Sequence, residues 1–250
     1  MVRALLVRGM LVGIVAGLLS FGFLKICGEP QVAVAIAFET QQDLAKEAAE
    51  HAKGEHVEHE PELVSRKVQA GLGLFVAVMV YCTAFGGLFG LAFAFAYGRT
   101  PGVLTPQAVS LLLAAAGFVA VYLVPSLKYP ANPPSVGDPH TIGMRTALYF
   151  IMIAISLAAM FGALAFKRLL VARFGDWNAS LMVAVYYIVI VVIAGLLLPA
   201  VNEVPADFPA VVLWKFRVAS IGAQFIMWAT FGVLFGAAAE RVFAGNKVYA

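Results

Sequence analysis

Residues 179–198 read ASLMVAVYYIVIVVIAGLLL, twenty residues without a charged side chain. An α-helix needs about 20 mainly apolar residues to cross the hydrocarbon core of a bilayer, so this stretch predicts a membrane-spanning helix. The rest of the chain has the same character, since 62% of its 250 residues are hydrophobic and 12% are charged. Soluble domains are roughly 45–50% apolar and 25% charged. The composition therefore indicates an integral membrane protein.

Five further apolar stretches are similar in length and composition. Together they predict an all-α integral membrane protein with about six transmembrane helices, forming a single membrane domain over residues 1–250. The predicted spans are residues 9–24, 70–96, 107–124, 146–166, 179–198 and 218–239.

Positive side chains gather on one side of this topology. Eight of the 17 Lys and Arg residues fall in short segments at the two termini, between the second and third spans, and between the fourth and fifth. The other nine lie in longer segments, together with 12 of the 14 acidic residues. Because cytoplasmic segments carry the excess of Lys and Arg, we expect a multi-pass protein of a bacterial inner membrane with both termini in the cytoplasm.

The three external loops differ from one another. Residues 28–69 form the longest polar segment, and residues 39–53 within it are rich in Ala, Gln, Glu and Lys, so we expect a short surface helix there. The other two loops, residues 125–139 and 199–209, are rich in proline. Proline holds such segments extended and out of helix.

Three histidines and six carboxylates fall within residues 47–62. Imidazole and carboxylate groups suit Co²⁺, Ni²⁺, Cu²⁺ and Zn²⁺. A four-residue spacing, as between His51 and Glu55 or Glu55 and His59, places two such ligands on one helix face. We therefore regard His51, Glu55, His56 and His59 as candidate metal ligands. The alternative is a solvated acidic loop whose histidines titrate near neutral pH.

The second external loop adds Asp138 and His140, which places all four histidines on the same predicted side of the membrane. Both residues are candidate metal ligands. A local structural role is favoured for the two together, because the Asp138 carboxylate can accept backbone N–H groups near Thr141, where the next helix begins.

The six spans contain no Asp, Glu, Lys, Arg or His, so a buried carboxylate proton relay is not expected. The chain has no Gly-rich ATP-binding loop, no Gly-x-Ser-x-Gly and no His-Glu-x-x-His, and we expect neither an enzyme nor a bound cofactor. The net charge of +3 is too small and too dispersed for a nucleic-acid-binding surface. Cys27 and Cys82 lack the spacing of a zinc site.

The hairpins share a pattern that indicates an internal repeat. Each external loop has an acidic residue close to a proline, at Glu29, Asp138 and Glu203, and each following span begins behind a cation. Phe-Gly pairs follow in each of these spans. Three related helical hairpins would produce this pattern, but small residues are common in membrane helices for packing reasons, so both interpretations stay open.

Several short strings resemble one family. They are GEP at residues 28–30 with AIAFE at 35–39, YPANPPSVGDP at 129–139, and PADFP at 205–209 with LWKFR at 213–217. These strings are spread over essentially the whole chain. They are similar to the predicted cobalt transporter subunit of the CbtA type.

The resemblance implies a membrane permease subunit that takes up Co²⁺, as transported substrate, for cobalamin synthesis. It also implies a small single-helix partner with a histidine-rich terminus, and assembly of several copies stays open. We expect the carboxylates to attract or coordinate the cation at the external mouth, and Asn132, Arg145 and Arg217 to hold the loops. The residues carried over by position are Glu29, Glu39, Asn132, Asp138, Arg145, Glu203, Asp207 and Arg217.

Two other functions stay open at this point. One is a membrane scaffold or assembly subunit that transports nothing, and the other is a channel for another divalent metal such as nickel. A permease needs the external acids for uptake, whereas a scaffold is indifferent to them.

Overall fold

The computed structural model describes residues 1–51, 64–99, 104–134, 136–137 and 139–247. Nearly all of these residues are helical, and none of them lies in a strand. Within these ranges five helices are long and apolar enough to cross a membrane. The expected all-α membrane fold is therefore confirmed. The five helices are Val2–Ala45, Arg66–Tyr97, Pro106–Lys128, Ile142–Leu197 and Ala210–Ala244.

The contacts of the described residues fall into two compact units. The first unit contains the described parts of Met1–Ala115, Asn132–Val136 and Ala206–Ala250. The second unit contains those of Ala116–Ala131 and Gly137–Pro205.

The first helix is far longer than its apolar stretch. It runs without a break through α1 (Val2–Phe23), the π-helical turn η1 (Leu24–Gly28) and α2 (Glu29–His51). We expected the first helix to end near residue 24, and that boundary is wrong. The helix-favouring residues from Glu39 to His51 form the end of α2.

Pro30 explains both why the end of the first helix was wrongly predicted and why the π-turn η1 forms. A proline has no N–H to donate to the carbonyl four residues back, but it is tolerated in the first turn of a helix. Here Pro30 is the second residue of α2, and the Glu29 N–H reaches the carbonyl of Leu24, five residues back. The π-turn thus starts a new helical segment at the proline and keeps the rod continuous.

The third helix repeats this arrangement. It passes through α5 (Pro106–Gly117), the π-turn η3 (Phe118–Leu123) and α6 (Val124–Lys128). Pro125 is again the second residue after the π-turn. In both helices, a π-turn just before a proline therefore allows the helix to continue past it.

Close backbone contact joins α1 to the second helix, which comprises α3 (Arg66–Val68), the π-turn η2 (Gln69–Gly73) and α4 (Leu74–Tyr97). A Cβ atom added at Gly9 would lie 2.1 Å from the carbonyl oxygen of Gly86, and one added at Gly13 would lie 2.4 Å from that of Cys82. Only glycine permits this approach, which is the usual packing of small residues between membrane helices.

The last helix of the chain comprises α8 (Ala210–Thr230), the π-turn η5 (Phe231–Phe235) and α9 (Gly236–Lys247). It packs on α1, and its aromatic side chains surround Phe89 of α4. The start of α5 lies against it, where the Ser110 hydroxyl donates to the carbonyl of Phe231 over 3.3 Å. These helices form the core of the first unit.

The second unit is built on a bent helix, α7 (Ile142–Leu197). Gly175, with φ 75° and ψ 166°, breaks the helix into two arms. Two contacts show that the arms run side by side. Ser156 hydrogen-bonds Tyr187 over 2.8 Å, and the Lys167 ammonium lies 3.0 Å from the Asp176 carboxylate. Counting the arms separately gives six apolar helical segments, in agreement with the predicted number.

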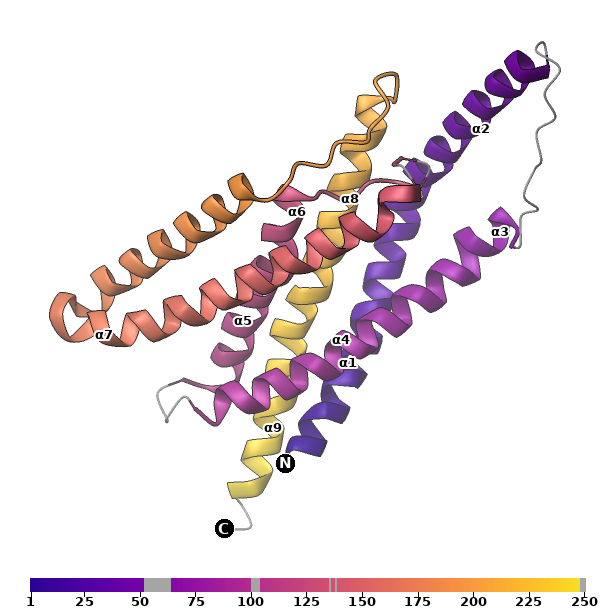
Figure 1. Cartoon of the computed structure of the whole chain (residues 1–250). Helices are drawn as coiled ribbons and strands as arrows, with labels where there is room; N and C mark the ends of the chain where they lie inside the picture. The colour runs from indigo at the N-terminus through magenta and orange to yellow at the C-terminus, as the bar shows by residue number, and fades with distance from the viewer. Residues whose placement is uncertain (52–63, 100–103, 135, 138, 248–250) are drawn as a thin grey trace. The chain divides into compact units, whose positions relative to one another are not determined.

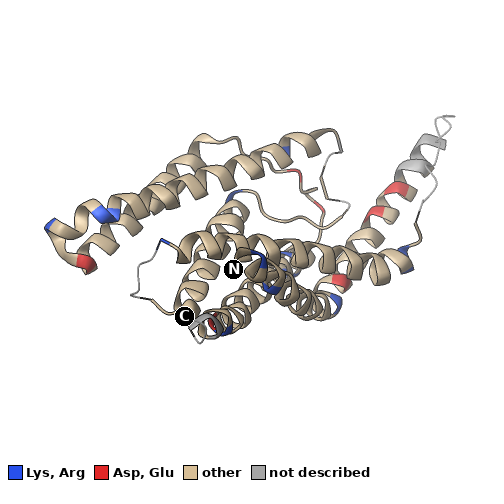
Figure 2. Cartoon of the chain, turned by 90° about the horizontal axis from the view of Figure 1, so that it is seen from below, with Lys and Arg blue, Asp and Glu red and all other residues tan. Residues whose placement is uncertain are grey.

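The N-terminus and the end of α9 lie at the same end of the first unit (Figure 1). Helices α1 and α9 are in contact. Acidic positions appear instead along α2, away from the basic positions around the N-terminus (Figure 2).

Candidate functional site

The strings that resemble the CbtA type occur in both units, and those at residues 28–39 and 206–217 belong to the first. Glu29 begins α2, and its carboxylate is paired with Arg66 at the start of α3. Both side chains are partly buried, with 15% of Glu29 and 31% of Arg66 exposed. One turn earlier, the Lys25 ammonium donates to the carbonyl of Ala70 over 2.9 Å. These two contacts clamp the first helix to the second.

The last external loop is attached to α2 rather than left free. The Gln42 amide donates to the carboxylate of Asp207 over 2.7 Å. Next to it, the buried Phe208 ring meets Phe38 edge to face, with the ring centroids 5.2 Å apart. The Gln42 amide carries no charge, so among the described residues this contact orients the Asp207 carboxylate without neutralising it.

Arg217 and Asn132 form the third contact of the first unit. The guanidinium of Arg217, on the third turn of α8, donates to the side-chain oxygen of Asn132 over 2.9 Å. Asn132 belongs to the proline-rich second loop, which this contact ties to α8.

The second unit holds a separate polar cluster around Glu203. Its carboxylate lies 3.2 Å from the guanidinium of Arg145 and accepts a hydrogen bond from the Thr141 hydroxyl. Arg145 packs against the backbone of Gly137, where φ is 126° and an added Cβ would lie 2.4 Å from Nη1. Glycine is therefore required at residue 137 both by its backbone conformation and by the guanidinium beside it.

Tyr129 holds the start of the loop that contains Glu203. Its hydroxyl donates to the carbonyl of Pro199 over 2.9 Å. Burial raises the pKa of the Tyr129 phenol above its ordinary value, because the charged phenolate is disfavoured away from water. The phenol therefore stays protonated, and a donor, at neutral pH.

Two of the remaining candidate ligands have side chains that the structure describes. Glu39 is exposed on α2, and His140 is exposed in the short 3-10 helix η4 (Pro139–Thr141). His51 ends α2, and nothing is described of its side chain. Glu55, His56, His59 and Asp138 lie outside the described residues. Among the residues that are described, no three His, Cys, Asp or Glu side chains form a group that could hold a metal ion.

Some of these polar contacts join residues of different loops, which the sequence analysis did not predict. The repeat pattern matches Glu29 with Arg66 within one hairpin. Arg145 of the second hairpin instead pairs with Glu203 of the third loop, while Arg217 of the third pairs with Asn132 of the second. Gln42 and Thr141 were not expected to take part. Gln42 is on the surface of α2 and Thr141 precedes the start of α7. No sequence pattern at either residue indicates such a contact.

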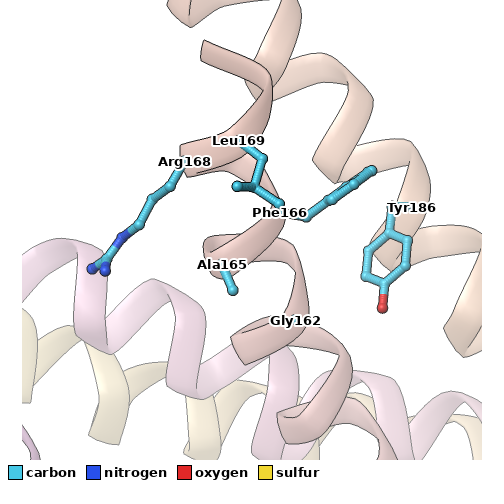
Figure 3. Close-up of a pocket in the computed structure, with 6 residues that line it drawn as sticks. All are labelled: Gly162, Ala165, Phe166, Arg168, Leu169 and Tyr186. Atoms are coloured by element: carbon cyan, nitrogen blue, oxygen red, sulfur yellow. The ribbon is translucent and has the colours of Figure 1, made fainter. Parts of the chain in front are cut away.

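A hollow of about 600 Å³ opens on the α7 hairpin. Figure 3 shows it lined by Gly162, Ala165, Phe166, Leu169 and Tyr186, with the Arg168 side chain beside it. Its lining is apolar apart from one cation and one phenol. Such a surface suits lipid better than a metal ion, which Arg168 would repel.

The fold and the polar loops define a multi-pass, all-helical membrane protein without a catalytic constellation in its described residues. A family model described as a probable cobalt transporter subunit (CbtA) matches residues 2–240. The chain therefore belongs to the CbtA family, as its short strings indicated. This is a family of transporter subunits and not of enzymes, so the expectation that the chain is not an enzyme is confirmed. Comparisons with curated proteins and with solved structures gave no match.

Proposed function

We propose that this protein is the membrane subunit that takes Co²⁺ into the cell across a bacterial inner membrane, supplying cobalamin synthesis. The observation that carries the proposal is the match of the probable cobalt transporter subunit over nearly the whole chain. The excess of Lys and Arg in the short segments near both termini supports a cytoplasmic location for those ends. The start of α2 at Glu29 and the loop that holds Glu203 and Asp207 then face outward.

The external acids first attract the cation. Exposed Glu39 and the acidic, histidine-containing tract that starts at His51 raise the local concentration of divalent cations. Among the candidate ligands, Asp207 keeps an uncompensated charge, because its partner Gln42 is neutral. Asp138 and His140, with Glu55, His56 and His59, complete the candidate ligand set.

The ion pairs of Glu29 and Glu203 define a resting state. An arriving divalent cation competes with one guanidinium for each carboxylate, and its double charge favours the exchange. Release of Arg66 from Glu29 would also unclamp the first helix from the second. Arg145, Arg217 and Asn132 act in this scheme by holding the loops in place.

Energy for inward movement is available without a motor. A membrane potential contributes about 2.3 kcal/mol per charge per 100 mV, so about 4.6 kcal/mol for a divalent cation. The word "subunit" in the family description implies a partner. We propose a small single-helix protein with a histidine-rich terminus, for which the exposed apolar side chains of α7 offer a surface within the lipid bilayer. Several copies of the chain can assemble in the same way.

Uptake of labelled Co²⁺ in cells without other cobalt importers tests the proposal. The chain is expressed alone and with the histidine-bearing partner, and Glu29→Ala and Asp138→Ala are compared with Asp176→Asn, an acid at the bend of α7. We expect uptake to fall in the first two variants at unchanged protein levels and to persist in Asp176→Asn. Excess unlabelled Ni²⁺ is then added during uptake of each labelled metal. Loss of labelled Ni²⁺ accumulation without loss of labelled Co²⁺ accumulation would separate the two metals.

Absence of uptake in every combination, with folded protein in the membrane, would reject the permease and favour a scaffold. Uptake of a labelled solute that excess Co²⁺ does not reduce would point to that solute as the substrate instead.

A further inference from the structure

Two buried polar atoms on α8 make no hydrogen bond with any described residue. They are Oε1 of Gln224 and Nε1 of Trp228. The two residues are four apart on a helix, so their side chains are neighbours on one face. Trp228 is only 8% exposed. In the same place, the Gln224 amide donates to the hydroxyl of Tyr81 on α4 over 3.3 Å.

These groups lie midway along helices that are long and apolar enough to cross a membrane. Trp228 is at the middle of the apolar helix Ala210–Ala244, and Tyr81 is at the middle of Arg66–Tyr97. Water does not reach this depth freely, and an unsatisfied polar group there is costly. A buried donor and a buried acceptor side by side at mid-membrane therefore point to a ligand.

The surroundings fix the two atoms in place. The Trp228 ring is held by Phe85 and Phe89 of α4, with centroids 6.4 Å away in each case, and by Phe231 at 5.9 Å. Its N–H therefore has one direction. The Gln224 amide is anchored through its own nitrogen to Tyr81, which leaves the oxygen available.

Further polar groups continue the site toward α1. The Ser20 hydroxyl donates to the carbonyl of Ala223 over 3.3 Å and also hydrogen-bonds the side chain of Cys82. Ser20 and Cys82 are 3% and 2% exposed. A strip of uncharged polar groups thus joins α1, α4 and α8 at the same depth.

The chemistry of the site selects its ligand. It offers one acceptor oxygen and one N–H donor, and a water molecule matches both by donating to Gln224 and accepting from Trp228. A bare cation is opposed by the indole N–H, and an anion is opposed by the amide oxygen. We propose that Gln224, Trp228 and Tyr81 bind a water molecule at mid-membrane in the first unit, and that this water hydrates the cation as it passes. The second part rests on the proposed function.

The fluorescence of Trp228 tests the water directly. Replacing the exposed Trp177 and Trp214 by Phe leaves a protein with one tryptophan, which is reconstituted in lipid vesicles. We expect emission at longer wavelength than from a dry indole, and a rise in intensity on transfer from H₂O to D₂O. Gln224→Leu removes the acceptor, so its emission shifts to shorter wavelength and the D₂O effect is lost.

Two further variants control this experiment. Thr230→Val also removes a buried polar group from α8, but that hydroxyl is satisfied by the carbonyl of Ile226 within its own helix. Its emission is expected to match the parent protein. Gln224→Glu keeps an acceptor oxygen and restores the long-wavelength emission. If Gln224→Leu fails to fold, Tyr81→Phe removes only the anchoring hydroxyl and is expected to give a smaller shift of the same sign.

Labelled Co²⁺ uptake then tests the path. Gln224→Leu is expected to lose uptake, and Thr230→Val to keep it. No D₂O effect in the single-tryptophan protein would overturn the water site. A D₂O effect with unchanged uptake in Gln224→Leu would overturn its place on the path. Absence of uptake in the parent protein itself, with the D₂O effect present, would reject the proposed function and leave the water site standing.

Discussion

Gly137 is the residue whose replacement has the most direct structural consequence. We expect Gly137→Ala to destabilise the protein by about 1–3 kcal/mol, since its positive φ is costly for other residues. The new Cβ would also displace the Arg145 guanidinium. Thermal unfolding in detergent measures the effect. The matched control is Gly143→Ala, where an added Cβ meets nothing within 4 Å. A neutral Gly137→Ala would contradict the described geometry.

Glu29 and Arg66 form a pair whose energy can be isolated. A double-mutant cycle with Glu29→Gln and Arg66→Gln is expected to give a coupling of about 0.5–3 kcal/mol, because residues in contact are not independent. The comparison pair is Lys167 with Asp176, whose carboxylate is 77% exposed. We expect about 0.2–1 kcal/mol there, as for surface ion pairs. Equal couplings for the two cycles would argue against the clamp.

The sequence selected five residues of the site whose side chains the structure describes. Glu29, Asn132 and Arg217 lie in the short strings, Glu203 belongs to the pattern shared by the hairpins, and Arg145 was carried over from the family resemblance. All five prove to be in polar contacts. Their partners could not be read, because a pairing such as Asn132 with Arg217 depends on how distant segments meet in space. Whether any of these residues binds the metal stays a prediction.

At the scale of elements, the contact between α1 and α4 depends on glycine. Gly13→Ala would place a methyl group 2.4 Å from the Cys82 carbonyl oxygen, and backbone cannot move aside as a side chain can. We expect destabilisation of about 1–3 kcal/mol, as for overpacked cores. Limited proteolysis or thermal unfolding in detergent measures it. Gly22→Ala, on the same helix but with open space around it, should leave stability nearly unchanged.

Element boundaries were harder to predict than elements. Residues 179–198 were identified from composition alone and form the second arm of α7. The first helix was expected to end near residue 24, because the apolar stretch ends there and a polar segment follows. The π-turn η1 instead lets the helix continue past Pro30, and apart from that proline no sequence pattern indicates the turn. Hydrophobicity also cannot show that two apolar segments are arms of one bent helix.

For the whole molecule, the topology is the property most open to direct measurement. We expect reporters fused to the N-terminus and to the C-terminus to show the same location, in the cytoplasm, because both ends lie together in the first unit (Figure 1). A cysteine introduced at exposed Glu39, with Cys27 replaced, should react with a membrane-impermeant reagent from outside. Termini on opposite sides would contradict the fold. Both termini outside would reverse the proposed orientation and leave the fold intact.

The length of the first helix has a mechanical consequence. From Glu29 to His51, α2 has 23 residues, which at about 1.5 Å per residue gives a rod of roughly 35 Å. This exceeds the thickness of the hydrocarbon core, about 30 Å. The rod is continuous with α1 and is held by the Glu29 and Arg66 pair at its base. The contact of Gln42 with Asp207 holds it further along, so a force applied beyond Gln42 acts on a lever with that contact as fulcrum and reaches the pair at the base.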